Sequence, residues 1–158
     1  MKKLESLRIH LLSIPGELID DPENLSTRAE RGTVYSHASG TNRHFELRYR
    51  AEVLVMNYSG DPDRLWFWVL QWLAVNQPDH APEAVSFNAD RLNDQSSDVL
   101  ISFDLTETVK VEETPEGVRL HHCSEPGIEP ELLPANPWSL YLDHRGESTK
   151  VTEWLQDG

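Results

Sequence analysis

Two long stretches of the chain alternate hydrophobic and polar residues, which is the pattern of β-strands that bury one face. The first stretch covers residues 45–57 and the second covers residues 98–113. In the first, the polar face becomes apolar at Leu54 and Met56, so we expect that end to be covered on both sides. The buried faces are predicted to carry Phe45, Leu47, Tyr49, Ala51, Val53 and Val55 in the first strand, and Val99, Ile101, Phe103, Leu105, Val109 and Val111 in the second.

One charged residue, Glu107, interrupts the apolar face of the second strand. A charge at such a position indicates a β-bulge, or a strand that emerges from the core toward a neighbouring subunit. Glu107 is therefore a candidate interface residue.

Two other segments place apolar residues at helical spacing. The first covers residues 3–13 and is ended by Pro15 and Gly16. The second begins after Asp61, which is placed to cap the helix, has Pro62 at its first position, and runs to about Val75. A helical wheel predicts one broad apolar face on this second helix, made of Leu65, Trp66, Val69, Leu70, Trp72 and Leu73.

The second helix carries three of the five tryptophans of the chain within seven positions. Phe67, Trp68 and Val75 lie outside the centre of its broad apolar face, so the helix is apolar over most of its circumference. A helix on the surface of a protein needs only one apolar stripe that faces the core. The surplus indicates either a contact with another subunit or a helix buried between sheet and loops. Trp66, Phe67 and Trp68 cannot all face one core, which favours the contact.

Shorter patterns complete the core. They predict a turn or short helix at residues 20–25, a strand running from residue 31 into a polar loop that ends near residue 44, a short strand at 84–89, and a hairpin turn at 114–117 leading into 118–122.

The C-terminal part of the chain is predicted to be a tethered hairpin. Closely spaced prolines make residues 124–137 an extended linker. Trp138, Leu140 and Leu142 then alternate in a strand that turns into a second one. This hairpin, residues 138–158, is either an arm that reaches a neighbour or a lid on its own domain. The expected fold is α+β: a mixed or antiparallel sheet packed against two main helices in residues 1–123, followed by linker and hairpin arm.

Composition and charge restrict the function. The chain has 158 residues, 14 basic against 27 acidic, and a formal net charge of −13. Binding a nucleic-acid backbone requires cationic side chains, so we expect no DNA or RNA binding. A single cysteine, Cys123, indicates a reducing compartment. No run reaches the length of a membrane span, and charges interrupt the N-terminal apolar segment, so we expect a cytosolic protein without a signal peptide.

Candidate sites for chemistry are weak. His121, His122 and Cys123 are adjacent, so a strand would point them to alternating faces, and no second pair of zinc ligands follows. Asp90, Asp94 and Asp98 lack the spacing and glycine of a calcium loop. We find no phosphate-binding loop, nucleophile elbow or dinucleotide fingerprint, and expect neither cofactor nor catalysis. The alternative is a small ligand-binding or hydrolytic domain, which would need a closed polar pocket beside the tryptophans.

Several stretches together carry a resemblance. They are "FELRY", "VLVMNYSGD", "WVLQWLAVNQPD", "FNADRLNDQSSDVLISFDLTETV", "SEPG" and "WSLYLD". In this combination the chain resembles the tail completion protein R family of P2-like tailed phages and related tail-like particles. The resemblance covers most of residues 20–145 and brings no catalytic residues with it.

The resemblance implies a structural protein at the head-proximal end of a contractile tail. It implies assembly in the bacterial cytoplasm, a place in the virion tail, and partners among tube, sheath and head-side connector proteins. By analogy with tail terminators we expect a six-fold ring of this chain, through which DNA passes without being bound. The candidate contact residues are Trp66, Phe67, Trp68, Glu107, Trp138, Leu140 and Leu142.

Overall fold

The computed structural model describes residues 1–14, 16–36, 43–124, 138–144 and 147–154. The chain divides into two compact units, residues 1–126 and residues 127–158, and each is described by itself. In the second unit the description covers the backbone of two strands. The linker predicted at 124–137 lies almost wholly outside the described residues, so its boundaries stay a prediction.

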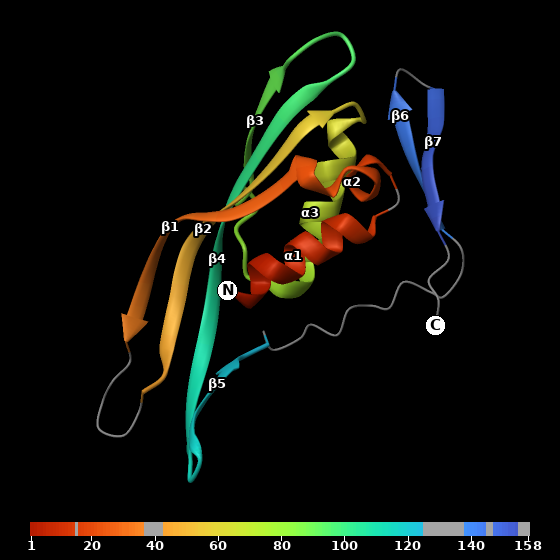
Figure 1. Ribbon diagram of the computed structural model, residues 1–158. Coiled ribbons are helices and arrows are strands. Elements are labelled where there is room, and N and C mark those ends of the chain that lie inside the picture. Colours follow the sequence, from red (N-terminus) through yellow and green to blue (C-terminus); the bar gives the residue numbers. More distant parts are fainter. Residues whose placement is uncertain (15, 37–42, 125–137, 145–146, 155–158) are drawn as a thin grey trace. The chain divides into compact units, whose positions relative to one another are not determined.

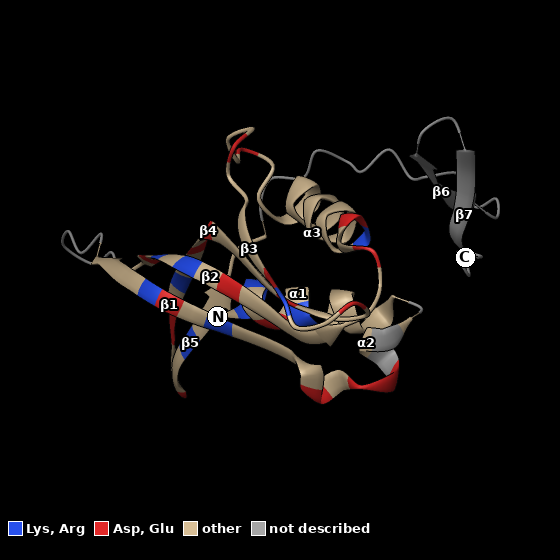
Figure 2. Ribbon diagram, turned by 90° about the horizontal axis from the view of Figure 1, so that it is seen from above, with Lys and Arg blue, Asp and Glu red and all other residues tan. Residues whose placement is uncertain are grey.

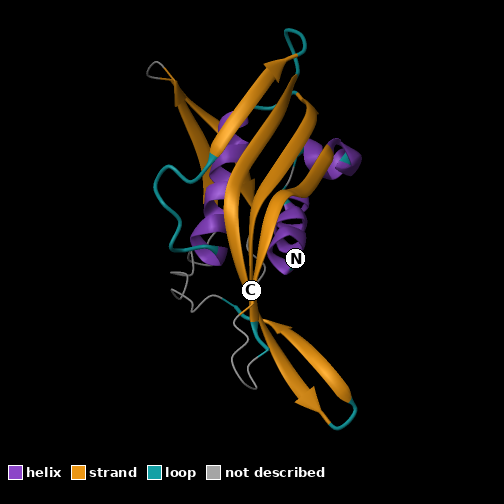
Figure 3. Ribbon diagram, turned by 90° about the vertical axis from the view of Figure 1, so that its left-hand side faces the viewer, coloured by secondary structure: helices purple, strands orange, loops and turns teal. Residues whose placement is uncertain are grey.

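The first unit is an antiparallel sheet with helices on one face (Figure 1; Figure 3). Strand order is β1-β2-β4-β3, and β5 pairs with the far end of β4. This arrangement confirms the α+β fold with an antiparallel sheet. The elements are α1 (Lys2–Ser13), α2 (Glu17–Asp20), the short 3₁₀ helix η1 (Pro22–Asn24), β1 (Leu25–Ser36), β2 (Phe45–Tyr58), α3 (Pro62–Asn76), β3 (Ser86–Arg91), β4 (Ser97–Thr114) and β5 (Gly117–His122).

The two long strands form the centre of the sheet, as their alternation predicts. β2 and β4 pair without a register shift from Phe45 opposite Val109 to Val55 opposite Val99. Most of their predicted inward residues are buried: Tyr49, Ala51, Val53, Val55, Val99, Ile101, Phe103, Leu105 and Val109. Phe45, Leu47 and Val111, at the other end of the pair, are only half-buried. The bulge expected at Glu107 is wrong, because Leu47 lies directly opposite Glu107 within this regular stretch.

β1 begins at Leu25, six residues before the position that we expected. It is an edge strand, and most of its residues are exposed. An edge strand with a solvated face needs few apolar residues, so its first half gives no hydrophobic signal. β3 is also displaced from its predicted position, by two residues, to Ser86–Arg91.

Helix α3 starts as predicted. The Asp61 side chain accepts a hydrogen bond from the backbone N–H of Asp63 at 3.0 Å, and Pro62 is the first helical residue. The predicted orientation of the helix is partly wrong. Leu70, which we placed on the core face, is 45% exposed, whereas Trp68, which we placed outside its centre, is 7% exposed. The buried face is rotated toward Trp68 because α1 covers that side of α3.

The contact between α1 and α3 shows how this happens. The His10 ring lies 6.0 Å from the Trp68 ring, and its Nε2 lies 3.2 Å from the Trp68 carbonyl oxygen. One turn further along, Trp72 Nε1 donates to Ser6 Oγ at 3.2 Å. Burial lowers the pKa of His10, against the opposing effect of its hydrogen bond to Trp68. Helices α3 and α1 thus pack beside each other on one face of the sheet.

The second unit contains the predicted hairpin. β6 (Trp138–His144) pairs antiparallel with β7 (Glu147–Trp154), and Trp138 lies opposite Trp154. The register shifts between Leu140 and Tyr141. The candidate residues Trp138, Leu140 and Leu142 therefore stand on β6, and their side chains lie outside the description.

Candidate functional site

An exposed aromatic surface lies where α3 meets β3. The rings of Trp66 and Phe87 are 4.5 Å apart. Trp66 is half-buried, whereas Phe87 is 64% exposed. Leu70 follows Trp66 by one helical turn, and residues at this spacing share a helix side. We call Trp66, Leu70 and Phe87 the aromatic patch. The sequence indicated Trp66, but Phe87 was recognised only as part of a short strand.

The other two aromatic candidates have different surroundings. Phe67 is half-buried, and its ring meets the Trp68 ring edge-on with centroids 4.8 Å apart. Trp68 lies in the core under α1, as described above. Of the three neighbouring aromatic residues, Trp66 and Phe67 therefore reach the surface. Trp68 is buried and packs against Phe67.

Glu107 is buried, and it holds the beginning of α1. Its Oε2 accepts the backbone N–H of Lys2 at 2.8 Å, and its Oε1 accepts the N–H of Lys3 at 3.2 Å. The Tyr49 hydroxyl also donates to Oε1, and His122 Nδ1 lies 2.8 Å from Oε2. A helix begins with N–H groups that lack partners within the helix, and a carboxylate there also suits the helix dipole. Glu107 therefore serves as a cap supplied by a distant strand.

The surroundings keep this carboxyl group ionised. Burial acts to raise the pKa of Glu107, but the hydrogen bonds from Tyr49, Lys2 and Lys3 favour the carboxylate, and the pKa lies below its usual value. The pKa of Tyr49 is raised strongly, first by burial and then by its bond to the Glu107 carboxylate. Both shifts have an internal cause, so the charge of Glu107 is explained without a neighbouring subunit.

A second polar cluster joins the end of α3 to α1 and β4. Gln77 is buried, and its Oε1 accepts Lys3 Nζ at 2.9 Å and the Thr106 backbone N–H at 3.1 Å. Gln77 Nε2 donates to Asp79 at 2.7 Å. Within the "NQPD" stretch, Gln77 therefore has a structural role, because it connects α3 to α1 and β4. No sequence pattern indicates this cluster, because its partners are far apart along the chain.

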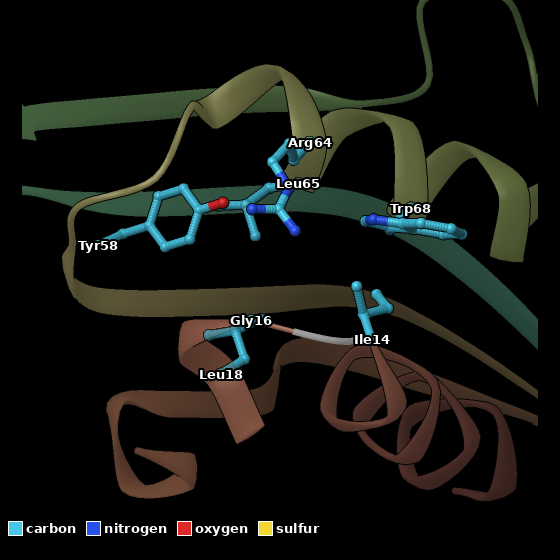
Figure 4. A pocket seen from close by; sticks show the side chains of 7 residues that line it. All are labelled: Ile14, Gly16, Leu18, Tyr58, Arg64, Leu65 and Trp68. Atoms are coloured by element: carbon cyan, nitrogen blue, oxygen red, sulfur yellow. The ribbon is translucent and has the colours of Figure 1, made fainter. Parts of the chain in front are cut away.

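The cavity beside the tryptophans is too small for a ligand. It measures about 20 Å³, and its lining residues are Ile14, Gly16, Leu18, Tyr58, Arg64, Leu65 and Trp68 (Figure 4). This is the space of about one water molecule, whereas small-molecule sites occupy hundreds of Å³. The geometry therefore does not favour the alternative of a ligand-binding or hydrolytic domain with the tryptophan helix as a pocket wall.

A larger groove of about 490 Å³ crosses the outer face of the sheet, away from the helices. Its lining carries three arginines, including Arg31, and two acidic residues. Arg50 lies 3.7 Å from Asp104 and 4.0 Å from Glu30, and Arg48 binds Glu46. Figure 2 shows basic and acidic residues interspersed on β1 and β2. Arg48 and Arg50 are thus paired with carboxylates on this outer face of the sheet.

Comparison with known proteins decides the family. The model of the P2 phage tail completion protein R (GpR) family matches residues 1–126, which are the residues of the first unit. The chain is also 34% identical, over 160 residues, to the tail completion protein R of Escherichia phage P2. That alignment covers 98% of this chain and 99% of the relative. The chain belongs to the tail completion protein R family. No solved structure matches it.

Four of the six stretches that resemble the tail completion protein R family lie in β2, α3, β3 and β4 of the first unit, and they include Glu107 and Gln77. "SEPG" begins at Ser124, and "WSLYLD" lies on β6 of the second unit. Within the first unit, the resemblance therefore follows the framework that positions the aromatic patch and the start of α1.

The structure separates the two histidines that were considered as metal ligands. His121 lies 2.9 Å from Glu112, whereas His122 lies beside Glu107, so the two imidazoles serve different contacts. The described residues contain no group of three or more His, Cys, Asp or Glu that could hold a metal ion. Within the same residues, no helix is long and apolar enough to cross a membrane.

Proposed function

We propose that this protein is a structural component that completes a contractile phage tail at its head-proximal end. It caps the tube or the sheath there and makes the tail competent to join a head. Membership of the tail completion protein R family carries this proposal. The water-sized cavity beside the tryptophans supports a role without catalysis. The protein assembles in the bacterial cytoplasm and remains in the virion tail.

The proposed partners are other copies of this chain, the tail tube or sheath protein, and head-side connector proteins. A ring requires two different complementary surfaces on each subunit. By analogy with tail terminators, the ring is six-fold. The net charge of −13 suits a ring through which DNA slides without adhering.

The proposed contact surfaces are the exposed part of α3, with Trp66 and Phe67, and the C-terminal hairpin, with Trp138, Leu140 and Leu142. Trp66 and Phe67 are half-buried and available to a partner, as large aromatic side chains at interfaces often are. Trp68 and Glu107 contribute from inside the subunit, where one supports the helix and the other fixes α1.

Deleting the gene from its source genome tests the function. After induction of particle production, electron microscopy should show unjoined tails or tubes of irregular length. A plasmid copy of the intact gene should restore normal particles, which controls for effects on neighbouring genes. Normal and functional particles from the deletion strain would refute the proposal.

Removing the hairpin tests its role as an arm. A chain ending at Asn136 is expected to keep the folded first unit, because that unit contains the buried core, and to lose assembly into tails. Circular dichroism and thermal melting measure the fold, and complementation of the deletion strain measures assembly. An insoluble truncated chain, or one that complements fully, would count against an arm.

A further inference from the structure

Strands β3 and β5 of the first unit are equal in length, and each leaves one edge without a paired strand among the described residues. β3 and β5 each have six residues, each pairs with β4 along one side, and every residue of both strands is exposed. Within the described residues, neither strand has a neighbour on its other side. Unpaired edges are templates for another strand, and proteins usually protect them.

The β4–β5 hairpin extends past the rest of the sheet, where residues 43–44 still contact β4: Val111 N donates to His44 Nδ1 at 3.1 Å, and Arg43 lies 3.0 Å from Glu113. Beyond Val109 the hairpin is a two-stranded ribbon that projects past β1, β2 and the helices (Figure 1; Figure 3). Val118 and Leu120 are 57% and 59% exposed on the sheet face that α1 and α3 cover elsewhere. A two-stranded ribbon is marginal in water, and a third strand paired to its edge stabilises it.

Both edges present their backbone groups in the same way. Cys123 N donates to Thr108 O, and Leu92 N donates to Ser96 O, so each of these is a hydrogen-bonded pair of its ladder. Alternation along the ladders then directs the backbone N–H and C=O groups of a different set of residues toward the free edges. These residues are Phe87, Ala89 and Arg91 on β3, and Val118, Leu120 and His122 on β5.

The charges of the two edges are complementary. On the outer face of the sheet, Asp90 lies opposite Asp98, and such a like-charged pair is unfavourable. The same face of β5 carries Arg119 and His121. If β5 of one copy joins β3 of another with the helix-covered faces on the same side, Leu120 meets the aromatic patch. In that orientation Arg119 and Asp90 lie on the same, outer face of the joined sheet. One arrangement therefore allows both the apolar contact of Leu120 and the attraction between Arg119 and Asp90.

We infer that β5 of one copy adds as a strand to the free edge of β3 in a second copy. β3 and β5 lie on the same side of β4, so the two copies are related by a two-fold axis, and β5 of each copy faces β3 of the other in one continuous sheet. Leu120 and Val118 cover Phe87, and Arg119 offsets the two aspartates. This inference rests on the proposal that copies of the chain assemble with one another, and it names the surfaces.

Mixing two single variants of the full chain tests the inference. Sedimentation velocity over a range of concentrations should show association of the wild type. Leu120→Lys blocks the donor edge and Phe87→Lys blocks the acceptor edge, so each is expected to weaken self-association about tenfold or more. An equimolar mixture should form a 1:1 heterodimer and nothing larger, because the mixture retains one intact edge of each kind.

Two further variants keep the test specific. Val34→Lys is the matched control, since Val34 is 65% exposed on the same sheet face but lies on β1, and it should associate like the wild type. Ala89→Pro removes an N–H directed to the free edge and leaves Phe87 on Trp66, and it should behave like Phe87→Lys. Thermal melting of each monomer checks that the fold is kept.

The inference is overturned by a monomeric wild type at every concentration, by blocked variants that associate normally, or by a mixture that stays monomeric. None of these results depends on tails. Heterodimers together with normal particles from the deletion strain would refute the proposed function and leave the edge pairing standing.

Discussion

Replacing Glu107 with alanine is expected to lower the free energy of unfolding by about 3–5 kcal/mol. The substitution leaves the buried Tyr49 hydroxyl and the N–H groups of Lys2 and Lys3 without their acceptor, and buried polar groups without partners are costly. Urea denaturation followed by tryptophan fluorescence measures the change. Glu112→Ala is the matched control on the same strand, because Glu112 is exposed, and its effect should be about 0.5 kcal/mol or less. Equal effects of the two substitutions would contradict the cap.

The stabilisation by Glu107 should also depend on pH. Because its pKa is lower in the folded chain than its usual value of 4.5, the folded state favours the carboxylate. This contribution is fully present above pH 4.5 and is lost as the pH falls through the lowered pKa. The difference in unfolding free energy between wild type and Glu107→Gln should therefore be constant near neutral pH and shrink in acid. A difference that grows in acid would show the opposite sign of the shift.

Trp68→Ala is expected to lower the free energy of unfolding by about 3–5 kcal/mol, as truncations of large buried aromatic residues do. Trp68 fills the space between α3 and α1, where it contacts His10 and Phe67. Thermal melting of the isolated protein measures the loss. The matched control is Trp66→Ala, which removes the same side chain from the half-buried aromatic patch and should cost clearly less.

Substitutions of Trp66 and Trp68 should also have different effects on stability and on assembly. In the deletion strain, Trp66→Ala is expected to fail in completing tails while its monomer stays folded. Trp68→Ala should instead reduce the amount of folded protein. A Trp68→Ala monomer as stable as the wild type would return that residue to the surface, where we first placed it.

The sequence predicted the framework because alternation and helical spacing are local signals. β2 and β4 lie within one residue of their expected bounds, and the Asp61 cap is confirmed. The rotation of α3 was not predictable, since a wheel shows how wide an apolar face is but not which neighbour covers each side. Trp68 moved inward, and Leu70 outward, because α1 packs beside α3.

The role of Glu107 was not predictable for a related reason. Its partners are backbone groups of α1, more than a hundred residues away, and no periodicity records such a contact. The charge of Glu107 on an apolar strand face correctly indicated an unusual position. However, the charge is explained by the cap on α1 and not by a β-bulge. Gln77 and Phe87 were missed similarly, since each gains its meaning from a partner on another element.

The cap on α1 also determines when this helix can be fixed during synthesis of the chain. Lys3 and Glu107 are separated by 104 positions, so the first turn of the helix has no acceptor until β4 has left the ribosome. At about 5–20 residues per second, that interval lasts on the order of 5–20 s. Closing so long a loop is an entropic cost that only the formed sheet repays. The N-terminal helix of this protein is therefore expected to be secured among the last parts of its first unit, although it is made first.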